Sequence, residues 1–191
     1  MTIQELKDYI LVNTSLDLSE EDIDDNVLTQ LVNAVLPIYG KYRSLDLRDR
    51  FRIRDFSIVF DRDNNQREII GVRELYVFNP ELSNYKKFDM NWHYDTQSKI
   101  LYVGLPGTYI INYLAMPTLD DIRYTDTLFL NMMLGKFMMY IGEQRKQFII
   151  NDIPISDDGE SLYDQGLNLY NDTLENLSNN LGNWYYGINY V

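Results

Sequence analysis

Gly107-Thr108-Tyr109-Ile110-Ile111-Asn112-Tyr113 is the stretch that decides the fold. Its aromatic and β-branched residues predict a strand over about 108–116, because such side chains pack well on a half-buried pleated surface. Pro117 ends this strand, and a methionine-rich helix is predicted from Leu119 to Ile141, where apolar residues gather on one side. A strand followed at once by a long helix predicts a mixed α and β fold.

Upstream of this stretch, two helices are predicted at the N-terminus. Apolar residues recur at helical spacing over Ile3–Val12, which predicts a short amphipathic helix. Ser19 is a candidate N-cap for a second helix, because its hydroxyl can accept from free backbone N–H groups. The apolar face of this helix runs from Ile23 to Leu36, and we expect the helix to end by Pro37 to Gly40.

The middle of the chain predicts strands. Apolar and charged residues alternate from Arg50, and two hairpins are expected downstream. The first joins 57–60 to 68–78 across a polar tip at 61–65, and the second joins 88–95 to 99–103. With a last helix after Asp157-Asp158-Gly159, ending near Gly182, the fold class is α+β: N-terminal helices, a mostly antiparallel sheet of four or five strands, then two C-terminal helices and an extended aromatic tail.

We interpret residues 1–182 as a single α+β domain and residues 183–191 as a C-terminal docking arm. The arm holds apolar side chains that are unfavourable in water and are typical interface anchors: Trp184, Tyr185, Tyr186, Ile188 and Tyr190. We expect the arm to reach a neighbouring subunit. The alternative is that it folds back on its own core.

Composition limits the function classes. The chain has 191 residues, of which 45% are hydrophobic, and no apolar run approaches the ~20 residues that span a bilayer. Without a signal-peptide pattern near the N-terminus, a soluble protein that is not secreted is expected. The absence of cysteine excludes disulfides, thiolate zinc sites and thiol nucleophiles.

The charge is uneven along the chain. The formal net charge of −12 disfavours nonspecific binding to nucleic acid or to an anionic membrane. Between Lys41 and Asp55, however, six basic residues stand against three acidic ones, so this segment carries +3 and the remainder −15. We predict that four arginines of this segment contact acidic surface on an adjacent subunit or partner, the alternative being a solvated strand face: Arg48, Arg50, Arg52 and Arg54.

Motifs for catalysis or metal binding are weak. His93 is the one histidine, and we expect it to have a surface or packing role in a hairpin. Asp61-Arg62-Asp63-Asn64-Asn65 matches half of a calcium loop, but Gln66 replaces the required Gly and Val72 the bidentate Glu, so a hairpin tip is favoured. The pairs Asp120-Asp121 and Asp157-Asp158 could form a carboxylate site but are typical of helix capping. We therefore predict no catalytic residues, no metal site and no cofactor.

Methionines on the predicted 119–141 helix allow two interpretations. Met132, Met133, Met138 and Met139 could form an adaptable contact surface, but methionine on a helix more often fills a core. Core packing is the favoured prediction.

The region from about Tyr102 to Gly182 resembles the head-to-tail connector (neck or ring adaptor) proteins of tailed bacteriophages. The resemblance rests on three short segments: the Gly107–Tyr113 strand with Pro117, the helix closing in Met138-Met139-Tyr140-Ile141-Gly142-Glu143-Gln144-Arg145, and the Asp158-Gly159 to Gly166 entry into the last helix. It implies a non-enzymatic virion protein in the neck, assembled in the host bacterial cytoplasm. The implied partners are copies of itself in a ring, commonly a dodecamer, and the portal and neighbouring neck or tail proteins, with DNA passing through without sequence-specific binding and no membrane.

Two alternatives stay open. One is a tail or baseplate adaptor of a phage, which would share the arm and helices but assemble with another symmetry. The other is a cellular interaction module or a carboxylate-based hydrolase.

Overall fold

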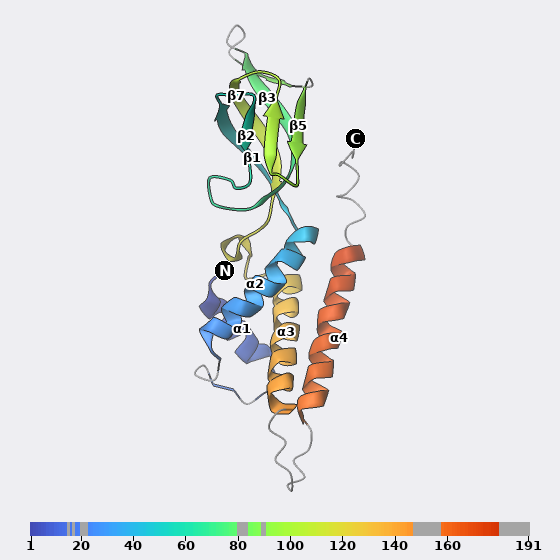
Figure 1. Cartoon of the computed structure of the whole chain (residues 1–191). Coiled ribbons are helices and arrows are strands. Elements are labelled where there is room, and N and C mark those ends of the chain that lie inside the picture. The colour runs from blue at the N-terminus through green and yellow to red at the C-terminus, as the bar shows by residue number, and fades with distance from the viewer. Residues whose placement is uncertain are drawn as a thin grey trace. The chain divides into compact units, whose positions relative to one another are not determined.

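The computed structural model describes residues 1–14, 16, 18–19, 23–79, 84–88, 91–146 and 158–179. These residues divide into two compact units within the span 1–182 that the sequence predicts as a single domain. The helical unit joins residues 1–42 to the described residues from Thr118 onward, and the β unit lies within residues 43–117 (Figure 1). The α+β class is confirmed, because the described residues form four α-helices and two antiparallel sheets.

The helical unit begins with α1 (Ile3–Asn13), as predicted. Thr2 caps it: its Oγ1 accepts from the backbone N–H of Glu5 at 3.1 Å, and the Glu5 carboxylate accepts from the N–H of Thr2 at 2.7 Å. Two otherwise unpaired N–H groups are thereby satisfied at the start of the helix.

Helix α2 (Asp25–Tyr42) differs from the prediction at both ends. It begins at Asp25, where the Asp24 carboxylate accepts from the N–H of Asn26 at 2.8 Å, and not at Ser19. It also continues through Pro37, which is exposed. The turn after the proline is held by Tyr39, which is buried and donates its hydroxyl to Asp126. Tertiary packing thus overrides the local tendency of proline to end a helix.

The predicted helix over 119–141 is two elements. A 3₁₀ turn, η2 (Leu119–Asp121), precedes α3 (Thr127–Lys146). The Asp121 carboxylate accepts from both N–H and hydroxyl of Thr118, at 2.9 and 2.7 Å, and closes this turn. A new cap then starts α3, because the Asp126 carboxylate accepts from the N–H of Phe129 at 3.1 Å. The predicted capping role is confirmed for Asp121, whereas the Asp158 side chain and Asp157 lie outside the described residues.

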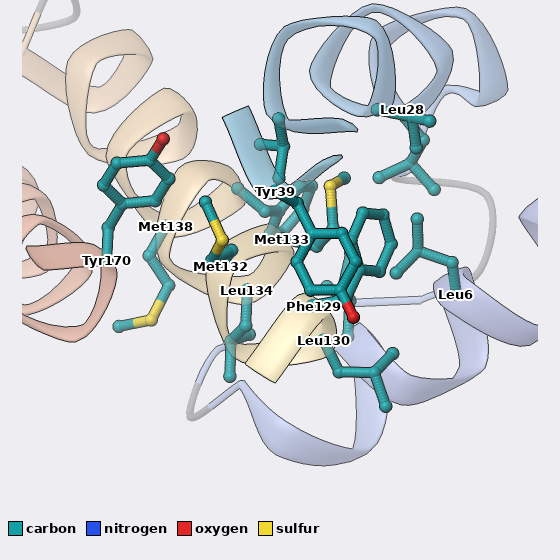
Figure 2. Close-up of a cluster of buried hydrophobic side chains, with 14 of the residues drawn as sticks. Leu6, Leu28, Tyr39, Phe129, Leu130, Met132, Met133, Leu134, Met138 and Tyr170 are labelled. Atoms are coloured by element: carbon teal, nitrogen blue, oxygen red, sulfur yellow. The ribbon is translucent and has the colours of Figure 1, made fainter. Parts of the chain in front are cut away.

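The methionines of α3 fill the core of the helical unit, as predicted. Met132 and Met133 are completely buried and Met138 is 8% exposed, whereas Met139 is half-buried. Figure 2 shows Met132 and Met133 among side chains from α1, α2 and α3, including Leu6, Leu28 and Phe129.

Helix α4 (Asp158–Asn179) packs along α3 at unusually close range. A Cβ on Gly135 would lie 2.8 Å from the carbonyl oxygen of Gly166, and one on Gly142 would lie 2.7 Å from that of Gly159. The two glycine pairs sit seven residues apart on each helix, so one face of each helix lets the antiparallel backbones approach.

The β unit contains two antiparallel sheets. The four-stranded sheet has the order β1 (Leu45–Ile53), β7 (Gly107–Ala115), β3 (Ile69–Asn79), β4 (Asn84–Lys87). The three-stranded sheet has the order β2 (Ser57–Val59), β6 (Ile100–Val103), β5 (Trp92–Asp95). β1 and β7 pair along their whole lengths, from Leu45 opposite Ala115 to Ile53 opposite Gly107. Buried side chains of both sheets share one core.

The first predicted hairpin is wrong. β2 pairs with β6 and β3 pairs with β7 and β4, so the two predicted arms belong to different sheets. The polar tip is a separate turn built on Asp63, whose carboxylate accepts from the N–H groups of Asn65 and Arg67, each at 2.8 Å. Tyr113 also reaches this carboxylate, at 3.3 Å, which ties the turn to the core. The second predicted hairpin is confirmed, because β5 pairs with β6.

Candidate interaction surface

Strand β1 sorts its side chains between two faces of the sheet. Arg48, Arg50 and Arg52 are exposed, and the intervening Asp49 and Phe51 are half-buried toward the shared core. This alternation follows from the pleat of a strand, in which successive side chains point to opposite faces. Three of the four predicted arginines therefore share one exposed face of β1, and their contact with an adjacent subunit or partner stays a prediction. Arg54 is exposed but lies beyond the end of β1.

The strand register places other side chains on the same face. Arg48 is opposite Asn112, which is opposite Glu74, and Arg50 is opposite Ile110, which is opposite Tyr76. Tyr76 is in turn opposite Lys87 on β4. We call this surface the arginine face and define it by the following residues: Arg48, Arg50, Arg52, Glu74, Tyr76, Tyr85, Lys87, Ile110 and Asn112.

Aromatic rings hold two of the arginines. The guanidinium carbon of Arg48 lies 5.2 Å from the centroid of the Tyr76 ring, and that of Arg50 lies 5.5 Å from the centroid of the Tyr85 ring. Because Tyr76 is on β3, the Arg48 side chain extends across β7 to reach it. Such contacts contribute about 0.5–1 kcal/mol each at exposed sites and restrict the side chain to a narrower set of rotamers. Two of the three positive charges on this face are thus held in place by tyrosine rings of the same sheet.

Glu74 organises the centre of the face. One carboxylate oxygen accepts from the Tyr76 hydroxyl at 2.8 Å and from the Asn112 amide at 3.0 Å, and the other accepts from the Lys87 ammonium at 3.0 Å. Hydrogen bonds from Tyr76 and Lys87 hold the pKa of Glu74 below its ordinary value, and the same bond to Glu74 raises the pKa of Tyr76. This ionised carboxylate fixes the ring on which Arg48 rests.

The ion pairs near the arginine face involve residues other than its three arginines. Asp46, which precedes them on β1, forms an ion pair with Arg73 of β3. Across the described parts of the chain, Arg48, Arg50 and Arg52 take part in no ion pair. The arginine face therefore offers three guanidinium groups, a lysine and tyrosine rings against a single carboxylate.

Most residues of the arginine face could not be predicted from the sequence. Glu74, Tyr76, Tyr85 and Lys87 come together only through strand pairing, and the sequence carries no signal for that register. The predicted interface residues of the arm, Trp184, Tyr185, Tyr186, Ile188 and Tyr190, lie outside the described residues. Their role stays a prediction.

The other motifs have structural roles where they are described. His93 is exposed on β5, and its ring stacks on Tyr102 at a centroid distance of 6.4 Å. The Asp63 oxygens of the half calcium motif are occupied by backbone N–H groups, by Arg67 and by Tyr113. The described residues include no cluster of three or more side chains of the types that hold metal ions.

No known family model matches this sequence, and comparison with curated proteins finds no significant relative. None of the described helices has the length and apolarity needed to cross a membrane.

Proposed function

We propose that this protein is a structural subunit of a homo-oligomeric ring in the head-to-tail connector, or neck, of a tailed bacteriophage. In this role it joins the portal and capsid to the tail, lines the passage for DNA and carries out no chemistry. It assembles in the host cytoplasm and resides in the virion neck. Its partners are copies of itself, the portal and adjacent neck or tail proteins.

The arginine face is the observation that supports an assembly role. A row of guanidinium groups fixed on a sheet is suited to a protein contact, because arginine and tyrosine are enriched at interface hot spots. The rest of the chain carries a net charge of −15, so any second copy of the protein can supply an acidic surface. The assignment to the neck itself rests on the resemblance of residues 102–182.

The experiment is mass measurement by light scattering after size exclusion, combined with negative-stain imaging. We expect closed rings whose population falls between about 0.1 and 1 M salt, over which the Debye length falls from about 10 to about 3 Å. Rings of another symmetry, or association with tail tips in virions, would favour the tail or baseplate alternative. A featureless monomer at all concentrations would contradict the ring and favour a cellular interaction module.

A further inference from the structure

Helix α4 carries one sign of charge. It contains five acidic residues and no basic residue along Asp158–Asn179. Asp164, Asp172 and Glu175 are exposed, and at 3.6 residues per turn they fall within a sector of about 80°. We call these three residues the acidic face.

The acidic face points away from the core of the helical unit. The opposite side of α4 is buried: Gly166 lies against the α3 backbone, and Tyr170 is 6% exposed. Two lysines of α3 approach α4, with Lys136 over the Tyr170 ring at 4.5 Å and Lys146 over the Tyr163 ring at 4.4 Å. Both rings project at least about 100° away from each residue of the acidic face, so the lysines lie on another side of the helix.

The acidic face matches the arginine face in sign and length. Asp164 and Glu175 are separated by about 16 Å along the helix axis, at 1.5 Å per residue. Arg48 and Arg52 are separated by about 14 Å along β1, at 3.4 Å per residue. The row of three carboxylates on the helix and the row of three guanidinium groups on the strand are therefore similar in length.

We propose that the arginine face of one copy binds the acidic face on α4 of the next copy. This inference rests on the proposed ring and names the two surfaces that join its subunits. Arginine can bind carboxylates with two parallel hydrogen bonds, which adds specificity to the charge attraction. The contact controls which surfaces meet and how fast they associate more than the final affinity.

This contact is of the type that a ring requires. The two surfaces differ, so each copy offers one of each to its neighbours and the contact is head-to-tail. Contacts of this kind repeat until the rotation closes, giving a ring, or continue as a filament when it does not. DNA is a poorer occupant of the arginine face, because the remainder of the chain carries −15 and repels it at long range.

The test uses two charge-reversed variants of the full chain. The first combines Arg48→Glu, Arg50→Glu and Arg52→Glu, and the second combines Asp164→Lys, Asp172→Lys and Glu175→Lys. Each variant alone should remain monomeric, since its like-charged surfaces repel. An equimolar mixture should regain the wild-type mass, because each variant supplies the surface that the other now needs, in alternation around the ring.

Control variants carry the same change in net charge at exposed positions elsewhere. Arg43→Glu, Lys86→Glu and Arg123→Glu match the first variant, and Asp8→Lys, Asp120→Lys and Glu143→Lys match the second. Both controls should assemble like the wild type. Circular dichroism verifies that each variant is folded. If the first variant does not fold, it is replaced by a variant that combines Arg48→Gln, Arg50→Gln and Arg52→Gln. Assembly of that variant should be weaker than that of the wild type and should not depend on salt.

The outcomes separate this contact from the ring proposal. An oligomeric wild type whose folded variants still assemble alone, or do not complement each other, would overturn the contact and leave the ring standing. Wild-type assembly that requires added DNA, and that DNA does not induce in the first variant, would also overturn it and assign the arginine face to DNA. A wild type that stays monomeric at the highest concentration reached would overturn both.

Discussion

Gly166→Ala tests the close approach of α3 and α4. A Cβ at this position would lie 2.6 Å from the carbonyl oxygen of Gly135, 2.8 Å from the nitrogen of Met139 and 2.9 Å from the Cβ of Met138. All three distances are well inside 3.4 Å, where ordinary van der Waals contact begins. Because two of these atoms belong to the α3 backbone, a side-chain rotation cannot relieve the contact and the helices must move apart.

The magnitude is a balance of two opposing effects. Alanine is more favourable than glycine by about 1 kcal/mol in a helix interior, so without the neighbour the substitution would stabilise α4. Overpacking a filled interior costs about 1–3 kcal/mol, and rigid backbone atoms place this site at the upper end. We expect the free energy of unfolding to fall by about 2 kcal/mol, which lowers the melting temperature by roughly 4–8 °C for a chain of this size.

Thermal and urea unfolding followed by far-UV circular dichroism measure this change. Gly71→Ala is the control, because no atom lies within 4 Å of its Cβ position and its φ is not positive. The control should change the free energy of unfolding by no more than about 0.5 kcal/mol. A Gly166→Ala protein with an unchanged or raised melting temperature would refute the close helix contact.

Burial raises the pKa of Tyr94 to about 12. The stability that this side chain contributes is therefore present below about pH 10, where the unfolded side chain ionises, and is lost as the pH rises toward 12. Tyr94→Phe removes the hydrogen bond to the carbonyl of Phe60, so it should lower the free energy of unfolding by about 1 kcal/mol at neutral pH and make that free energy fall less steeply with rising pH in alkali. His93→Ala should change the free energy of unfolding by no more than about 1 kcal/mol and leave assembly intact, since His93 is exposed and its ring stacks on exposed Tyr102. Loss of a measurable activity in this variant would contradict the non-enzymatic proposal. Truncation after Gly182 should preserve the circular dichroism spectrum but abolish rings, whereas a large drop in the monomer's melting temperature would show that the arm belongs to its own core.

The helices were predictable in kind but not always in extent. Ile3–Val12 carries both an apolar period and the Thr2 cap, so sequence and structure agree on α1. α2 passes Pro37 because Tyr39 is anchored to Asp126, 87 residues away in sequence. No local pattern contains that contact, and it outweighs the local signal from proline.

The sequence predicted where strands occur better than it predicted which strands pair. Most strand segments were predicted, but β2 pairs with β6, more than forty residues away in sequence, and not with β3. The same limit applies to the interaction surface. The alternation of β1 predicted the exposed arginines, while the tyrosines and Glu74 that fix them come from strands whose neighbours only the fold defines.

The pairing of Leu45 with Ala115 gives the β unit a closed base. The chain enters along β1 and leaves along β7 at adjacent points, so residues 43–117 form a cassette whose two ends meet. Because the two ends are adjacent, a short turn could replace the cassette. The entropic cost of loop closure would change little, since it depends only weakly on loop length. A gene could therefore gain, lose or exchange the arginine-bearing cassette in one recombination event while α1 to α4 keep their own packing.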